Sequence, residues 1–281
     1  MRVEAIVGHS TTRPISWQSL WQRAKGLVAR PEPADGICLS RRHELLARLA
    51  PIGPLRTDRI ELWPSDEALW ITHTADFERL LSNSVYDFAT DYMPNWAEIW
   101  PCGVLLAGVI AQNPEALRGQ RVLELGPGVG VTAVAALRAG ADLTVADYDM
   151  GALALTSLNA LDQTGREPRA MHLNWREPSR EFLRVAGEGW PLVLGADLLY
   201  ERKDVRPLLA LLERIILPGG ELWLGESGRE EAQRMVKALR WRKWSGPSEP
   251  YTSPLPDPNY GTFDVITVHK LRRPLEQEDG G

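Results

Sequence analysis

An apolar run that leads into three alternating glycines constrains the fold of this chain more than any other feature. The run is Val122 to Leu125, and the glycines are Gly126, Gly128 and Gly130. Glycine lets the backbone turn sharply and lets a ligand approach where a Cβ would otherwise stand. A helical pattern begins directly after the turn, and the free amides at a helix start favour polar or anionic groups. The segment predicts a strand-to-helix turn that binds a nucleotide-like ligand.

The glycine spacing and two nearby acids narrow the class of ligand. A dinucleotide site follows G-x-G-x-x-G, but the position three after Gly128 is Val131. Glu124 lies inside the strand, where a carboxylate suits a cationic group better than a pyrophosphate. Asp147 ends the next apolar run, where an acid accepts the ribose hydroxyls of a nucleotide. Asp149 is the other candidate for this role, but it could instead only cap the following helix.

From residue 121 onward, short apolar runs alternate with helical patterns, which predicts βαβ units and a parallel sheet covered on both faces. The predicted strands are 121–125, 142–146, 169–173, 191–196 and 220–225, and the predicted helices are 129–139, 150–162, 178–186, 204–216 and 228–240. A last run at 263–270 has no helix after it and predicts an antiparallel edge strand. The expected fold class is α/β, doubly wound.

Residues 1–94 have a different pattern and predict an N-terminal α+β extension to a domain at 95–281. Prolines break two short helical patterns at 15–28 and 41–49. Two apolar runs on either side of residues 64–67 predict a hairpin. Residues 76–93 again have a helical pattern, which ends at Pro94.

Composition excludes several classes of protein. The 281 residues are 25% charged with a net charge of −5, which argues against general nucleic-acid binding. No apolar run of about 18 residues predicts a membrane span, and the first residues lack a signal-peptide pattern, so a cytoplasmic protein is expected. Cys38 and Cys102 have no metal-finger spacing, and no other cluster has metal-ligand spacing. Neither a disulfide framework nor a metal site is therefore expected.

The E-x-G-x-G-x-G pattern resembles motif I of class I S-adenosylmethionine (SAM) methyltransferases. Further segments resemble the lysine-methyltransferase-like group of the seven-β-strand methyltransferases (methyltransferase family 16), which includes enzymes that modify the electron-transfer flavoprotein β subunit. These segments are W-P-x-G at 100–103, L-N-W at 173–175, D-x-x-Y at 197–200 and the turn at 217–220. The resemblance covers roughly residues 95–270. It implies a Rossmann-like, mostly parallel seven-stranded sheet with SAM as cofactor.

The resemblance also implies a set of cofactor-binding residues. The tryptophan of W-P-x-G contacts the cofactor in that group, and an L-D-W segment lines the adenine, although Asn174 stands here in place of the usual acid. The implied set is Trp100, Glu124, Gly126, Gly128, Gly130, Asp147, Asn174, Trp175 and Asp197. Taken alone, Trp100 and Trp175 are better explained as core aromatics, but their placement beside the expected cofactor edge favours cofactor contact instead.

Asp197 and Tyr200 are the predicted catalytic residues. Asp197 follows the fourth strand, and open α/β sheets bind ligands at the carboxyl ends of their strands. Methyl transfer is an in-line displacement that needs positioning more than acid–base help. We assign Asp197 to orienting the acceptor and Tyr200 to closing its pocket. The alternative for Asp197 is a loop cap near Asp204, and Glu226 either faces the acceptor or is a solvated loop acid.

The resemblance implies methyl transfer to an amine nitrogen, above all that of a protein lysine, with no nucleic-acid or membrane partner. The alternative is a small-molecule methyltransferase or another SAM-consuming enzyme. A closed aromatic pocket built by the extension would favour that alternative, and its candidate residues are Trp17, Trp21, Trp63 and Trp70. The intact D-x-x-Y segment argues against a SAM-binding protein without activity, and Val131 argues against nicotinamide oxidoreduction.

Overall fold

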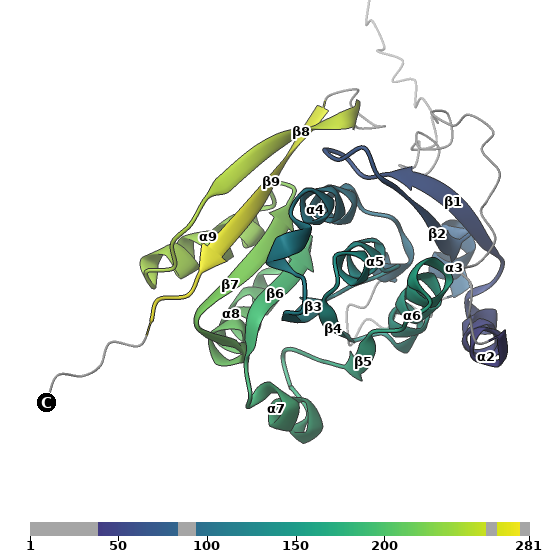
Figure 1. Cartoon of the computed structure of the whole chain (residues 1–281), viewed down its shortest axis with the longest axis horizontal. Helices are drawn as coiled ribbons and strands as arrows, with labels where there is room; N and C mark the ends of the chain where they lie inside the picture. The colour runs from purple at the N-terminus through teal and green to yellow at the C-terminus, as the bar shows by residue number, and fades with distance from the viewer. Residues whose placement is uncertain (1–38, 84–93, 257–262, 276–281) are drawn as a thin grey trace, which may run out of the picture.

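The computed structural model describes residues 39–83, 94–256 and 263–275 (Figure 1). The predicted helix at 15–28, with Trp17 and Trp21, and the end of the helical pattern at 76–93 lie outside the described residues. A seven-stranded sheet forms the centre of the molecule. Its spatial order is β5 (Arg169–His172), β4 (Asp142–Asp147), β3 (Arg121–Leu125), β6 (Trp190–Ala196), β7 (Ile216–Glu226), β9 (Phe263–Arg272) and β8 (Ser248–Pro256).

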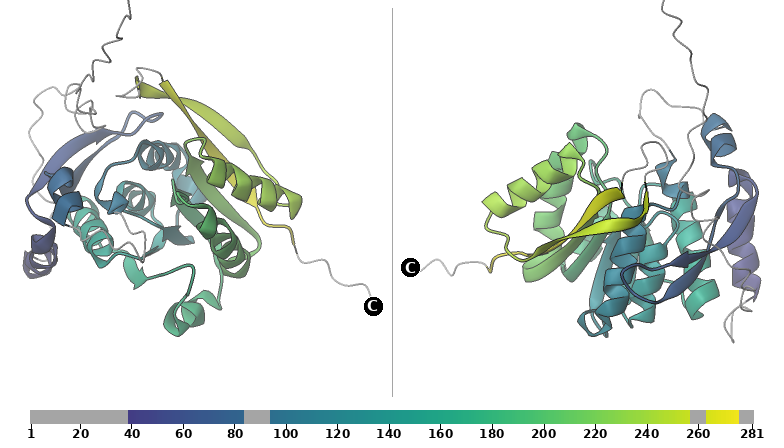
Figure 2. Two further views of the ribbon diagram at one scale, coloured as in Figure 1. Left: turned by 180° about the vertical axis from the view of Figure 1, so that it is seen from behind. Right: turned by 90° about the horizontal axis from the view of Figure 1, so that it is seen from above.

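Helices cover both faces of this sheet, as expected for a Rossmann-like doubly wound fold (Figures 1 and 2). One face carries α4 (Pro101–Gln112), α5 (Val131–Arg138) and α6 (Met150–Thr164), and the other carries α7 (Arg180–Ala186), α8 (Arg202–Ile215) and α9 (Glu230–Trp241). Successive strand side chains point to opposite faces, so Val122 packs in the first core and Leu123 in the second. Burial on both faces explains the continuous apolar runs of the strands.

The five predicted parallel strands and the helices between them are confirmed, with ends shifted by a few residues. The last strand, β9, is antiparallel as predicted, but the expectation that it forms the edge is wrong because β8 pairs outside it. The sequence pattern missed β8, since it contains Pro250, Pro254 and Pro256. Proline cannot donate to a ladder and is tolerated mainly at a sheet edge, which is where β8 lies.

Helix α4 was also missed, because its buried residues run almost without a break from Cys102 to Ile110. A helix that is apolar all round has no amphipathic period to recognise. Its packing leaves almost no space at one point. A Cβ on Gly108 would stand 2.3 Å from the carbonyl oxygen of Trp63, so α4 and the turn of the N-terminal hairpin are in direct contact.

The described part of the N-terminal segment packs on the helices rather than over the sheet edge. It comprises α2 (Leu39–Leu49), the predicted hairpin of β1 (Leu55–Glu61) and β2 (Ala68–Thr74), and α3 (Phe77–Asn83). Figures 1 and 2 show the hairpin beside α6. Its buried residues Ile60, Leu62, Leu69 and Ile71 belong to the same core as α4, α5 and α6. A domain boundary near residue 95 stays a prediction.

Asn159, on α6, ties the hairpin to the glycine-rich turn. Its Oδ1 accepts the Thr72 amide at 2.7 Å, and its Nδ2 donates to the carbonyls of Thr72 and Val129 at 2.7 and 2.8 Å. Asn159 is fully buried, so these bonds satisfy polar groups that water does not reach. The side chain therefore fixes β2 and the start of α5 in one arrangement.

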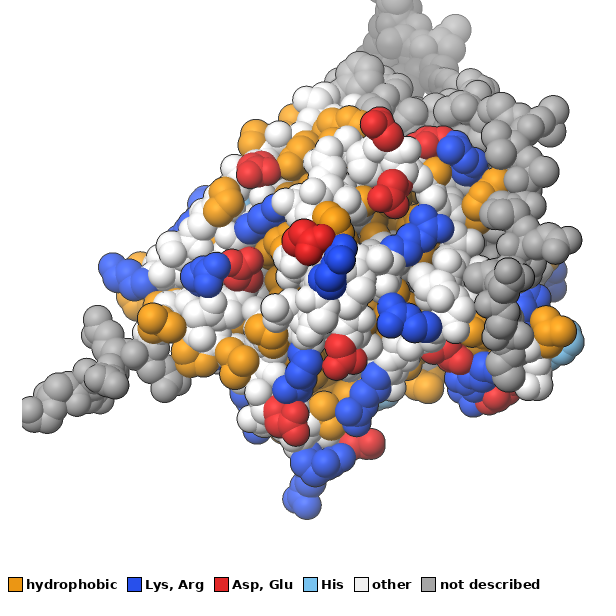
Figure 3. Space-filling model, in the orientation of Figure 1, with side chains coloured by type: hydrophobic (Ala, Val, Ile, Leu, Met, Phe, Trp, Pro, Cys, Tyr) orange, Lys and Arg blue, Asp and Glu red, His pale blue; other side chains and the backbone are white. Residues whose placement is uncertain are grey.

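No helix within the described ranges is long and apolar enough to cross a bilayer. On the face shown in Figure 3, basic and acidic side chains are interspersed. This is the pattern of solvated charges.

Candidate functional site

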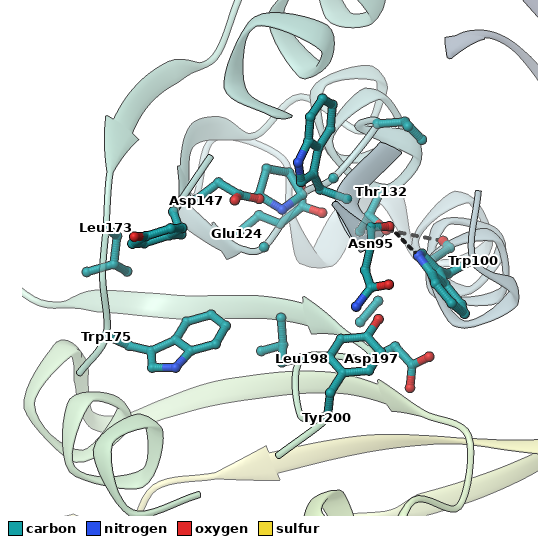
Figure 4. A pocket seen from close by; sticks show the side chains of 18 of the residues that line it. Asn95, Trp100, Glu124, Thr132, Asp147, Leu173, Trp175, Asp197, Leu198 and Tyr200 are labelled. Atoms are coloured by element: carbon teal, nitrogen blue, oxygen red, sulfur yellow. Dashed lines mark hydrogen bonds between the residues drawn. The ribbon is translucent and has the colours of Figure 1, made fainter. Parts of the chain in front are cut away.

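A cavity of about 370 Å³ lies at the carboxyl ends of β3, β4 and β6. Figure 4 shows Leu173 and Trp175 on one side of it and Asn95, Trp100 and Tyr200 on the other. The structure brings nearly all the predicted site residues to its wall, namely Trp100, Glu124, Gly126, Gly128, Asp147, Asn174, Trp175, Asp197 and Tyr200. Of the predicted set, Gly130 does not line the cavity.

The glycine-rich turn shapes the cavity by adopting a left-handed backbone. Gly126, Gly128 and Gly130 have φ of 59°, 56° and 88°. A Cβ on Gly126 would lie 2.9 Å from the Leu198 side chain, and one on Gly130 would lie 2.9 Å from the Thr156 Cα. Gly130 therefore acts behind the cavity wall, where it lets the start of α5 approach α6.

Glu124 and Asp147 form the deep, acidic end of the cavity. Glu124 is 2% exposed, and its Oε2 has no hydrogen-bond partner among the described residues. Burial, assisted by the charge of Asp147, raises the pKa of Glu124 to about 8. Burial also raises the pKa of Asp147 to about 7, although its carboxylate accepts the Asp149 amide at 2.9 Å. Without a ligand these acids keep their protons to higher pH than usual, and a cation or a hydrogen-bond donor from a ligand would stabilise the ionised form.

Asp149, the alternative to Asp147 as the ribose-binding acid, is instead a helix cap. It is the N-cap of α6, and its Oδ1 accepts the amides of Gly151 at 2.6 Å and Ala152 at 3.3 Å. Its carboxylate is therefore committed to the helix start. Asp147 remains the acid that faces the cavity at the end of β4.

The wall formed by the L-N-W segment is held by Asp204, which also lines the cavity. The Trp175 indole donates to Asp204 Oδ1 at 3.1 Å, and Arg176 binds both carboxylate oxygens at 2.5 and 2.8 Å. These bonds outweigh burial and hold the pKa of Asp204 below its ordinary value. Asn174 accepts the Arg176 amide at 3.0 Å, so its side chain supports this loop while it lines the cavity.

Sequence reasoning missed Trp96, which lines the cavity beside the predicted Trp100. The Trp100 indole donates to the Asn95 carbonyl at 2.7 Å and its ring meets Tyr200 edge-on at 6.1 Å (Figure 4). The Trp96 Nε1 is buried without a hydrogen-bond partner in the described structure. Trp96 also packs so closely that a Cβ on Gly151 would lie 2.8 Å from its ring. The sequence signal that could have indicated Trp96 is its position in the same W-A-E-I-W-P segment as Trp100.

The predicted acceptor end is built around Asp197. This residue is 6% exposed, has a φ of 51°, and accepts the Ser227 hydroxyl at 2.9 Å. Arg229 faces both carboxylate oxygens, with Nε and Nη2 at 3.4 and 3.5 Å. A left-handed backbone outside glycine is uncommon and clusters at functional sites. The alternative was that Asp197 only caps the loop entering the helix near Asp204, but its carboxylate contacts Ser227 and Arg229, and the N-cap of α8 is Glu201.

Tyr200 stands beside Asp197 and closes this end of the cavity. The Arg229 guanidinium lies 4.7 Å above its ring. Burial, assisted by the charge of Asp197, raises the pKa of Tyr200 above its ordinary value, so the hydroxyl is neutral at ordinary pH. The neutral hydroxyl both donates and accepts hydrogen bonds.

Two other expectations are wrong. Glu226 is neither at the cavity nor solvated: it is 4% exposed, accepts the Gly228 amide at 2.6 Å and faces His269 at 3.4 Å. Trp63 and Trp70 build no aromatic pocket over the site, since no described residue before 94 lines the cavity. Trp63 instead contacts the Tyr251 ring edge-on at 5.5 Å. The hairpin binds the helix layer, which carries these tryptophans away from the carboxyl ends of the strands.

No group of three or more His, Cys, Asp or Glu side chains within the described ranges is arranged to hold a metal ion. The polar groups that line the cavity are carboxylates, amides, hydroxyls and the Arg176 guanidinium. This donor set fits a nucleoside that carries a cationic chain.

Comparisons with known proteins agree with this geometry. A family model described as lysine methyltransferase matches residues 94–237. The electron transfer flavoprotein beta subunit lysine methyltransferase of Danio rerio is 31% identical over 49% of this chain and 52% of its own length. The protein N-lysine methyltransferase METTL21A of Danio rerio is 29% identical over 64% of this chain and 86% of its own. The histone-arginine methyltransferase METTL23 of Mus musculus is 28% identical over 40% and 44%. The chain spans about half the length of the first curated relatives it matches.

Proposed function

This chain belongs to the lysine methyltransferase family, a group of SAM-dependent methyltransferases, and from that premise we propose that it methylates the side-chain amine of a protein lysine. When bound, SAM supplies a methyl group on a sulfonium, so that an N–C bond forms from the nitrogen lone pair while the C–S bond breaks and its electron pair goes to sulfur. The task of the protein is to bind both reactants in line, exclude water and leave the nitrogen lone pair free.

The deep end of the cavity suits the cofactor. The unpartnered Glu124 Oε2 supplies an acceptor for the ammonium of the methionine moiety, and Asp147 supplies one for the ribose hydroxyls. Either bond compensates a carboxylate that otherwise lies buried without a counter-charge. Trp175 and Leu173 supply the apolar wall that an adenine ring requires.

One observation carries the proposal: a single cavity holds both the acidic deep end and the Asp197–Tyr200 end. A donor and an acceptor bound in it share one cavity, as direct methyl transfer requires. In that space Asp197 orients an N–H of the acceptor amine, and Tyr200 and Trp100 bound the channel by which the side chain arrives.

A guanidine acceptor is the second candidate, and one observation favours it. A relative that matches 40% of this chain is named a histone-arginine methyltransferase. A carboxylate such as Asp197 orients a guanidinium as well as it orients an amine. The distinction therefore depends on the product.

Incubation with methyl-labelled SAM and a lysate of the source organism tests the proposal. Label on protein, with methyl-lysine in the digested band by mass spectrometry, is the expected result, and Asp197→Ala is the matched inactive control. Methyl-arginine would move the proposal to the second candidate. Label confined to small molecules would contradict both.

A further inference from the structure

The acid at the acceptor end is held by a residue that does not line the cavity. We propose that Arg229 is a positioning residue that neutralises Asp197, so that the acceptor amine reaches the cavity without being held as an ammonium ion. This inference rests on the proposed transfer to an amine, and it adds a residue that the sequence motifs did not include.

The contact is a two-pronged ion pair between a buried carboxylate and a partly exposed guanidinium. Arg229 Nε faces Asp197 Oδ1 at 3.4 Å, and Nη2 faces Oδ2 at 3.5 Å. The Asp197 side chain is 4% exposed, so solvent screens the pair less than it screens surface ion pairs. Ser227 adds a neutral donor to Oδ1 at 2.9 Å. Both oxygens of Asp197 therefore face donors on the side away from Trp175, where Figure 4 shows the carboxylate pointing.

Arg229 is itself fixed by its surroundings. It is the residue before α9, and its guanidinium lies over the Tyr200 ring at 4.7 Å. The preceding turn is closed by Glu226, which accepts the Gly228 amide at 2.6 Å, and by Gln233, which donates to the Gly228 carbonyl at 3.2 Å. The charge opposite Asp197 is therefore part of the folded framework.

The other titratable groups around the pair are Cys102 from α4, Tyr200 from the loop after β6, and Glu226 from the end of β7. Burial raises the pKa of the Cys102 thiol and that of the Tyr200 hydroxyl, so both stay neutral at ordinary pH. Glu226 accepts the Gly228 amide at 2.6 Å and faces His269 at 3.4 Å. Arg229 is thus the positive charge that offsets Asp197 among the residues the structure describes here.

This offset matters because a nucleophilic amine needs a free lone pair. A bare carboxylate beside a lysine ammonium favours the protonated, unreactive form. With Arg229 opposite, Asp197 keeps the geometry of a hydrogen-bond acceptor while its net effect on the amine pKa is reduced. Arg229 acts through Asp197 and contacts neither reactant.

The affinity of SAM relative to S-adenosylhomocysteine (SAH) tests this electrostatic role without turnover. The two ligands differ by the methyl group and the positive charge at sulfur. In Arg229→Met, the uncompensated Asp197 should favour the charged ligand, and the ratio Kd(SAH)/Kd(SAM) measured by calorimetry should rise about tenfold. Arg229→Lys should stay within about twofold of the wild type, because it keeps the charge. An unchanged ratio in Arg229→Met would overturn the inference.

Two further variants separate charge from structure. Arg234→Met removes an arginine one turn along α9 that pairs with Glu230, and it should leave the ratio unchanged. Asp197→Asn combined with Arg229→Met should restore the wild-type ratio, since no uncompensated acid remains. If Arg229→Met does not fold, Arg229→Gln makes the same comparison.

The pH dependence of turnover completes the test with a methyl-accepting lysine peptide. In Arg229→Met, the alkaline shift of the kcat profile should be about one pH unit, because the bound amine keeps its proton to higher pH. If Arg229→Met turns over at the wild-type rate, with no alkaline shift of its profile and no change in the ligand ratio, the inference would be overturned. A wild type that methylates no amine would overturn the proposed function instead, while the ligand ratio would still decide the role of Arg229.

Discussion

The two ends of the cavity treat a buried carboxylate in opposite ways. At the deep end, Glu124 has an oxygen without a partner, and burial raises the pKa of both Glu124 and Asp147. At the other end, Asp197 is as deeply buried but faces Ser227 and Arg229. The deep end thus depends on a ligand to complete it, whereas the protein completes the acceptor end itself. We therefore expect the deep end to determine cofactor affinity and the acceptor end to determine how the acceptor is oriented.

The largest effect on activity should come from a change at Asp197, at the acceptor end. Asp197→Ala should lower kcat by at least about a hundredfold, because the acceptor loses its orienting group. SAM affinity should change far less, and calorimetry beside a methyl-transfer assay measures both. Loss of both properties, or of neither, would contradict the separation of the two ends.

Removal of the Glu124 carboxylate at the deep end should instead affect SAM affinity more than kcat. Glu124→Gln should weaken SAM binding by about tenfold, because one charge-assisted contact is lost. In the wild type, affinity should also rise with pH as Glu124 and Asp147 ionise around their pKa values of about 8 and about 7. Titrations between about pH 6 and about pH 9 measure this dependence, which Glu124→Gln should flatten. Flat wild-type binding would show that Glu124 does not bind a cation.

The same acids should lower the stability of the ligand-free protein at high pH. The pKa of Glu124 is raised in the folded state from 4.5 to about 8, so the folded protein holds its proton where the unfolded chain has lost it. The free energy of unfolding should therefore fall as pH rises between these values, by on the order of 5 kcal/mol. Urea unfolding across this range measures the slope. Glu124→Gln should reduce it.

The smallest effect should come from outside both ends. Trp63→Phe keeps an aromatic ring at the Tyr251 contact and should cost less than about 1 kcal/mol of stability. Because the hairpin does not line the cavity, kcat/KM should stay within about twofold. A large loss of activity with normal stability would show that the extension reaches the acceptor after all.

Much of the fold followed from the sequence, and the misses have physical causes. Regular strands and amphipathic helices carry a period, which is why the sheet from β3 to β7 was recognised. Helix α4 has no polar face to set a period, and β8 has three prolines that its edge position tolerates. Glu226 has the sequence position of a site residue, but β9 places His269 beside it and the side chain turns into the interior.

The sequence by itself determined the glycine-rich turn, the two acids that end β3 and β4, and the D-x-x-Y segment, because each depends on neighbours within a few residues. Only the tertiary structure decided what those residues meet. Arg229 reaches Asp197 across 32 positions because β7 lies next to β6 in the sheet. Asn159 reaches Thr72 across 87 positions because the hairpin packs on α6. Local backbone geometry depends on residues close in the sequence, whereas the compensation of a buried charge depends on which strands and helices become neighbours.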